Sequence, residues 1–175
     1  MTLRAAAGWI TLVVLASPAR AGDERWIATV STARLAAPDA AEGGELESFG
    51  SGGALSITWL EHCRSGRLCG ALDSSALFLR GDDGARLYDL SVSIMGSFSL
   101  ENPVAPFLAV GLDLVSAAVP ESSGAMTRGV GLGVHGNVGL HAWIGERFYA
   151  RGQLGYLGAA VGGVKGELGI GTWFE

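Results

Sequence analysis

Residues 129–144 read GVGLGVHGNVGLHAWI, and this stretch decides the fold because its apolar residues fall on every second position. Valine, leucine, alanine and isoleucine occupy the even-numbered positions, and only Gly136 interrupts them. The odd-numbered positions hold glycine, histidine, asparagine and tryptophan. Because successive side chains of a β-strand point to opposite faces, the stretch predicts a long strand with one apolar face and one small or polar face.

The same alternation recurs at 87–100 and at 164–174, and weaker alternation fills the rest of the chain. Eight strands are predicted, at 24–35, 54–62, 71–80, 86–100, 106–116, 128–144, 147–157 and 164–174. Two separators, 36–53 and 117–127, are longer than the others. Short connections make consecutive strands antiparallel neighbours, since a parallel crossover needs about a dozen or more residues. The pattern therefore predicts an all-β, eight-stranded, antiparallel up-and-down barrel.

Composition excludes several other classes of protein. Hydrophobic residues make up 49% of the chain, which argues against a disordered protein. The formal net charge is −5 and no basic cluster is present, which argues against a nucleic-acid-binding protein. After residue 21 no continuous apolar run reaches the roughly 18 residues that a transmembrane helix requires. Glycine is unusually frequent, at 28 of 175 residues, and charged residues are scarce, at 17%.

Residues 1–21 have the features of a cleaved secretory signal peptide. Arg4 precedes an apolar stretch too short to span a bilayer, and Ala19-Arg20-Ala21 forms a small-x-small cleavage pattern. We therefore expect residues 22–175 to be the mature barrel domain of an exported protein. In such a protein Cys63 and Cys69, six positions apart, are predicted to form a local disulfide across a turn.

The distribution of residues between the two strand faces indicates a membrane barrel. A soluble barrel packs apolar side chains inside and shows lysine and glutamate outside, whereas a membrane barrel has the reverse arrangement. The polar face of this chain is too poor in lysine and glutamate for a solvated surface, and its glycine, serine, histidine and asparagine suit a narrow lumen. Aromatic residues also gather at both ends of the predicted strands, as in two interfacial girdles, if both termini are periplasmic.

The inward face is predicted to carry a polar network that fills the lumen. Its predicted members are Asp89, Asp113, His135, Asn137, Arg151, Gln153, Lys165 and Glu167, with His141 on the same face. Opposite charges in a narrow lumen must pair, and Arg151 with Glu167 is the favoured pair because their strands are adjacent. Since side chains fill an eight-stranded barrel, no open pore is expected.

No enzymatic activity, metal or cofactor is predicted. No nucleophile, base and orienting group can be assembled from the sequence, and neither His135 nor His141 belongs to a His-x-Ser motif. Six residues of strand place the two histidines roughly 20 Å apart, too far for a shared metal ion.

The chain resembles the small bacterial outer-membrane β-barrel superfamily, the OmpA/OmpX-like eight-stranded group, over about residues 24–175. The resemblance rests on GERFYARGQLGY at 145–156 and on a terminal strand that alternates and ends near an aromatic residue. It implies that Leu168, Ile170 and Phe174 form an assembly signal for the barrel-insertion machinery, although Glu175 follows the aromatic.

The resulting interpretation is an integral, monomeric outer-membrane protein surrounded by membrane lipids and lipopolysaccharide. Its expected role is structural, or recognition through extracellular loops. Three alternatives stay open: a soluble exported lipocalin-like barrel that binds an apolar ligand, a lipid A-modifying enzyme, and a small gated pore.

Overall fold

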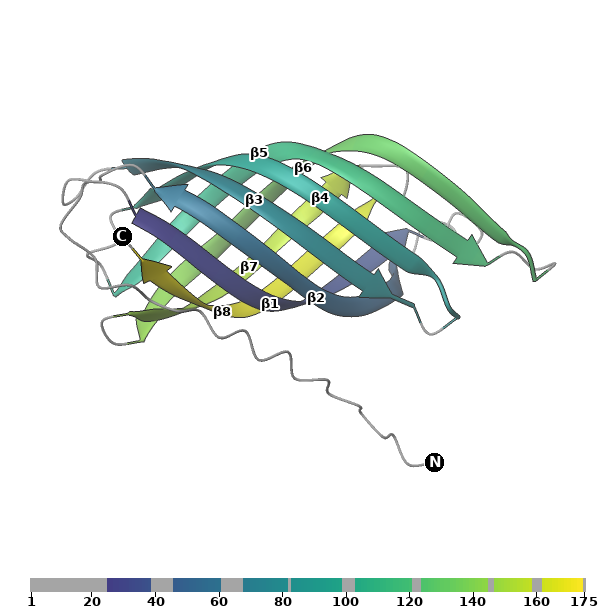
Figure 1. The fold of residues 1–175 in the computed structure, drawn as a ribbon, viewed down its shortest axis with the longest axis horizontal. Coiled ribbons are helices and arrows are strands. Elements are labelled where there is room, and N and C mark those ends of the chain that lie inside the picture. The colour runs from purple at the N-terminus through teal and green to yellow at the C-terminus, as the bar shows by residue number, and fades with distance from the viewer. Residues whose placement is uncertain are drawn as a thin grey trace, which may run out of the picture.

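The computed structural model is a closed β-barrel and describes residues 25–38, 46–60, 68–81, 83–98, 103–120, 124–144, 147–158 and 162–174 (Figure 1). Its strands are β1 (Arg25–Pro38), β2 (Leu46–Leu60), β3 (Leu68–Arg80), β4 (Arg86–Phe98), β5 (Val104–Pro120), β6 (Met126–Ile144), β7 (Phe148–Gly158) and β8 (Gly163–Phe174). The described part of the chain contains no helix long and apolar enough to cross a membrane.

Every strand pairs antiparallel with its neighbours in sequence, and β8 closes the barrel on β1. The predicted number of strands, their order and their up-and-down connection are confirmed. We call the end where β1 begins and β8 ends the proximal end, and the other end the distal end (Figure 1). The longest strands are β5 and β6, with 17 and 19 residues, and they project past the other strands at the distal end.

The two long separators predicted from the sequence are wrong in extent, because strands continue into both. The first separator contains the last residues of β1 and the first eight of β2, and the second contains the end of β5 and the start of β6. Small residues such as Gly52, Gly53 and Ala117 blur the alternation there. Each nevertheless has a ladder partner, and neighbouring strands can impose an extended backbone that the local sequence does not reveal.

A β-bulge in the first hairpin adds an inward-facing aromatic ring. Leu35 pairs with Gly50, whereas Ala36 pairs with Ser48, so Phe49 is the extra residue on β2. Its side chain packs against buried leucines inside the barrel. Phe49 lies within the predicted separator 36–53, so its place in a strand differs from the prediction.

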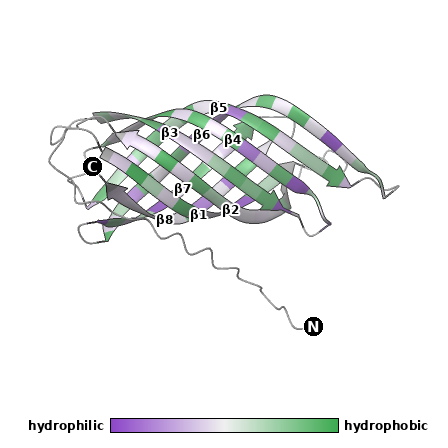
Figure 2. Ribbon diagram, in the orientation of Figure 1, coloured by the Kyte–Doolittle hydropathy of each residue, from purple (hydrophilic) through white to green (hydrophobic). Residues whose placement is uncertain are grey.

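Hydrophobic and less hydrophobic residues alternate along the strands (Figure 2), and the two faces of the strands differ in exposure as this alternation predicts. Outward-facing Ile94, Leu132, Val134 and Leu140 are 67%, 83%, 60% and 51% exposed. Along β4 exposed and buried residues alternate almost without interruption. The apolar side chains therefore cover the outside of the barrel.

The interior is layered rather than uniformly polar. A proximal cluster of buried residues comprises Ile27, Ala71, Met95, Phe107, Ala109 and Tyr149, with Trp143 and Trp173 packed against it. A distal cluster comprises Ala33, Leu35, Ala54, Leu77, Leu79, Leu87, Val115 and Leu157, with Phe49 against it. Buried polar and charged side chains occupy the space between the two clusters. These apolar layers differ from the polar lumen that the strand parity predicts.

Bulky inward side chains lie over glycines on the neighbouring strand. Tyr149 faces Gly171, Phe107 faces Gly139, His135 faces Gly111 and Asn137 faces Gly155. A Cβ atom at each of these glycines would lie less than 3.0 Å from its partner's side chain. The inward glycines thus provide the space that the large lumen side chains fill.

Candidate functional site

The candidate site is the layer of buried polar side chains between the proximal and distal clusters, which we call the polar chamber. The structure places every residue of the predicted lumen network on the inward face. Seven are buried as whole residues: Asp89, Asp113, His135, Asn137, Arg151, Gln153 and Lys165. The side chain of Glu167 is 9% exposed.

Arg151 organises the proximal half of the chamber. Its Nη1 and Nη2 donate to Oδ1 and Oδ2 of Asp73 on β3, at 3.3 and 3.1 Å. Further donations reach Gln153 Oε1 at 2.9 Å and Ser56 Oγ at 3.3 Å. The guanidinium carbon also lies 4.9 Å from the centre of the Phe107 ring. Fork-like pairing of this kind is the strongest geometry available to an arginine and a carboxylate.

The favoured pairing of Arg151 with Glu167 is therefore wrong. On β8 the residue opposite Arg151 is Gly169, and Glu167 lies opposite Gln153 instead. The arginine side chain crosses the lumen to Asp73, which also accepts a hydrogen bond from Thr58. Asp73 was missed because the strand at 71–80 carries small residues on both faces, so its inward parity was not apparent.

One further ion pair and one hydrogen bond from a histidine occupy the distal half of the chamber. Lys165 Nζ lies 3.0 Å from Glu167 Oε1, and Ser31 donates to the other oxygen of that carboxylate at 3.2 Å. His135 Nδ1 lies 2.7 Å from Asp113 Oδ1. These contacts tie β8 to β1 and β6 to β5, so the polar residues join neighbouring strands as well as filling space.

Asp89 differs from the other carboxylates. It is 1% exposed, and within the described residues neither of its oxygens has a hydrogen-bond partner. Its neighbours in the ladder, Leu77 and Val115, belong to the distal cluster. A charged carboxylate in such a position is costly to bury.

His135 and His141 lie in different environments. His141 lies at the proximal end, stacked on Phe107 with ring centres 4.6 Å apart and in a T-shaped contact with Tyr149 at 5.2 Å. Tyr149 in turn hydrogen-bonds to Thr29. In the described chain neither ring nitrogen of His141 has a hydrogen-bond partner, and no group of three or more His, Cys, Asp or Glu side chains could hold a metal ion.

Several solved structures share this architecture. Ail, the attachment invasion locus protein of Yersinia pestis, is 15% identical over 87% of this chain and 99% of its own, with a TM-score of 0.62. The N-terminal β-barrel domain of Pseudomonas aeruginosa OprF is 17% identical over 87% of this chain and 98% of its own, with a TM-score of 0.58. The outer membrane enzyme PagL is 17% identical over 83% and 98%, with a TM-score of 0.50.

This chain has the fold of the small outer-membrane β-barrels. No protein-family model matches it, and no curated protein is significantly similar in sequence. Because proteins with this small-barrel fold include an attachment protein and an enzyme, the fold alone does not specify an activity.

Three predictions concern the ends of this small barrel. Leu168 and Ile170 of the proposed assembly signal face outward and are 72% and 62% exposed. The backbone of Phe174 pairs with Trp26, while its side chain lies outside the described part of the structure. The signal peptide and Cys63 also lie outside the described residues, so cleavage at residue 21 and the Cys63–Cys69 disulfide stay predictions.

Proposed function

We propose that the protein is an integral, monomeric outer-membrane protein that acts in recognition at the cell surface. The observation that carries the membrane assignment is the apolar outer face of the barrel. An exposed belt of this size is unfavourable in water and marks a surface that meets lipid or protein. Closure of the barrel gives each strand a neighbour on both sides, so unpaired edges lie at strand ends, such as residues 126–133 of β6 at the distal end. Lipid would not tolerate unpaired edges within the bilayer.

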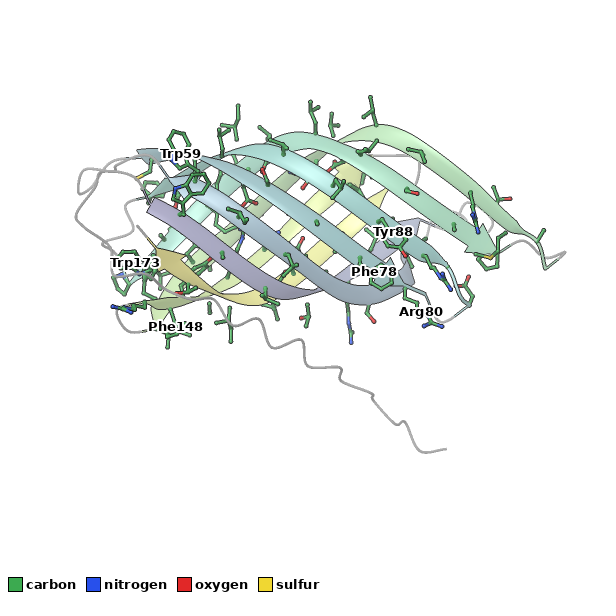
Figure 3. The ribbon with its side chains drawn as sticks, viewed as in Figure 1. Trp59, Phe78, Arg80, Tyr88, Phe148 and Trp173 are labelled. Carbon is green, nitrogen blue, oxygen red and sulfur yellow. The ribbon has the colours of Figure 1, made fainter. Side chains whose placement is uncertain are left out.

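Aromatic residues at the two ends of the belt support this assignment (Figure 3). Trp26, Phe98 and Phe148 are exposed at the proximal end, and Phe78 and Tyr88 are exposed at the distal end. Aromatic side chains favour the boundary between hydrocarbon and water. Other aromatics at the proximal end, including Trp143 and Tyr149, instead close the lumen.

The lumen argues against the alternative functions. A lipocalin-like carrier needs an apolar cavity, whereas ion pairs fill the middle of this barrel. A pore needs a continuous wet path, whereas apolar clusters close both ends of the chamber. A hydrolase needs an activated nucleophile, and within the described residues neither histidine bonds to a serine or threonine hydroxyl.

Recognition is favoured over a purely structural role by the projecting β5–β6 hairpin, which extends the distal end of the barrel (Figure 1). With the termini in the periplasm, this end faces the outside of the cell. Lipopolysaccharide would surround it there, and the barrel-insertion machinery would deliver the protein to the membrane.

Cell fractionation and gel migration test the membrane assignment. We expect the protein in the outer-membrane fraction, extracted only by detergent, with different migration before and after boiling. Recovery in the soluble periplasmic fraction would exclude the proposal. Removal of residues 119–127 then tests the role. Loss of surface binding with normal barrel assembly supports recognition, and full complementation of a deletion strain by this variant supports a structural role instead.

A further inference from the structure

Four arginines lie in one line across the outer surface of the distal end. The strand register joins Arg34 on β1 to Ser51, Ser51 to Arg80 on β3, and Arg80 to Arg86 on β4. It continues from Arg86 to Ala118 and from Ala118 to Arg128 on β6. We call Arg34, Arg80, Arg86 and Arg128 the arginine row. All four face outward and are exposed.

The arginine row carries four positive charges. Arg80 and Arg86 are direct cross-strand partners, a position in which like charges repel. In the described part of the chain, the ion pairs involve His135, Arg151 and Lys165 and none of the row. Four of these six strands thus place a basic side chain on one register line, and a bound anion would relieve the repulsion between Arg80 and Arg86.

The row borders the surface that meets lipid. Phe78 lies two residues before Arg80 on β3, and Tyr88 lies two residues after Arg86 on β4, both on the proximal side of the row. Their rings pair on the outer face, with ring centres 5.0 Å apart. Figure 3 shows Arg80 beyond these two rings at the distal end. Such aromatic side chains favour the headgroup level of a membrane, so guanidinium groups just beyond them reach the depth of lipid phosphates.

The row also occupies only one side of the barrel. In the described part of the chain the outer faces of β7 and β8 carry no basic residue, because Arg151 and Lys165 both face inward. A general requirement for charge at the membrane surface would place basic residues around the whole rim, so the one-sided row indicates a site.

We propose that the arginine row binds the phosphate groups of an anionic lipid in the leaflet at the distal end, a phosphorylated glycolipid of the lipid A type. The planar guanidinium pairs with phosphate through two parallel hydrogen bonds. Strands about 4.8 Å apart place Arg80 and Arg86 within reach of one phosphate and put Arg34 and Arg128 on either side for others. This inference rests on the proposed membrane location.

Lipid binding by the purified, folded protein tests the inference. The variant is Arg80→Gln/Arg86→Gln/Arg128→Gln, and the matched control is Arg147→Gln, an exposed arginine at the proximal end. The probes are bisphosphorylated lipid A, its dephosphorylated form and inorganic phosphate, with binding measured by native mass spectrometry from detergent micelles. We expect the triple variant to bind bisphosphorylated lipid A at least about tenfold more weakly, since loss of about 1.4 kcal/mol corresponds to tenfold.

The control variant and the other two probes distinguish the possible results. We expect the control to bind like the unaltered protein, the dephosphorylated lipid to bind weakly, and inorganic phosphate not to displace lipid A at equal concentration. Equal binding by the triple variant and the unaltered protein would overturn the inference, as would equal binding of both lipids. Displacement by equimolar phosphate would assign the row to free phosphate instead. A protein that forms a heat-modifiable barrel in lipid but fails these tests loses only this inference, whereas one that stays soluble without detergent loses the proposed function.

Discussion

Arg151 on β7 and Asp73 on β3 form a bidentate ion pair across the lumen, although their strands lie on opposite sides of the barrel. Such a contact braces the closed barrel in a way that the pairing of neighbouring strands cannot. Arg151 is 5% exposed and Asp73 6%, so neither charge can be satisfied by bulk water if the other is lost.

Arg151→Met is therefore expected to lower the free energy of unfolding by about 3–5 kcal/mol, because Asp73 would be left as an uncompensated buried charge. Urea unfolding in lipid vesicles, followed by tryptophan fluorescence, measures the change. The control Arg147→Met removes an exposed arginine and should shift stability by less than about 0.5 kcal/mol. Equal effects of the two substitutions would show that the pair does not stabilise the barrel.

Asp89 and Asp113 should respond in opposite directions to the same substitution. Asp89→Asn removes an unpartnered buried charge and is expected to stabilise the barrel by about 1–3 kcal/mol. Asp113→Asn weakens the contact with His135 and is expected to destabilise by a similar amount, about 1–3 kcal/mol. The same unfolding measurement at neutral pH compares the two variants. Destabilisation by Asp89→Asn would mean that this carboxylate has a partner in the folded protein.

Much of the fold follows from residues 129–144, because strict alternation over a long segment fixes both the secondary structure and the two faces. The same parity places Lys165 and Gln153 in the lumen. Parity does not specify which partner an inward side chain contacts, however. The side chain of Arg151 is long enough to contact either Glu167 on β8 or Asp73 on β3. Its pairing with Asp73 depends on closure of the barrel, which brings distant segments together.

The distal ends of the strands were missed for a different reason. Ladder pairing extends β1 and β2 through residues with little side chain, where alternation carries no signal. Phe49 points inward only because of the bulge opposite Leu35, and the arginine row exists only in the register of six strands. Such features are properties of strand alignment and cannot be read from any one segment.

Arginine substitutions on the outer face test how far the apolar belt extends along the barrel. Val92 lies in the middle of β4 and is 58% exposed, so Val92→Arg is expected to cost about 2–4 kcal/mol in a bilayer. Val130, near the distal end of β6, is also outward-facing and is 73% exposed, and Val130→Arg should cost only about 0–1 kcal/mol. Unfolding in vesicles measures both. Equal small costs at the two positions would place Val92 in water.

The inward glycines predict a sharp difference between two alanine substitutions. Gly171→Ala would place a Cβ atom within 2.5 Å of the Tyr149 ring and is expected to destabilise by about 1–3 kcal/mol through overpacking. Gly136 faces outward with no atom within 4 Å of an added Cβ, so Gly136→Ala should be neutral or slightly stabilising. Thermal unfolding in detergent compares them, and equal tolerance of both would argue against a tightly filled proximal end.

The apolar face of β6 is expected to contact lipid. Nitroxide labels on single cysteines at Val130, Val134, Val138 and Ile144, in a Cys63→Ser/Cys69→Ser background, test it in lipid vesicles. Collision rates with oxygen and with a water-soluble nickel complex report the environment of each label. If β6 contacts lipid, oxygen collisions dominate at Val134 and Val138, and nickel collisions rise toward Val130 and Ile144. High nickel accessibility at all four positions would show a water-exposed strand and contradict the membrane assignment.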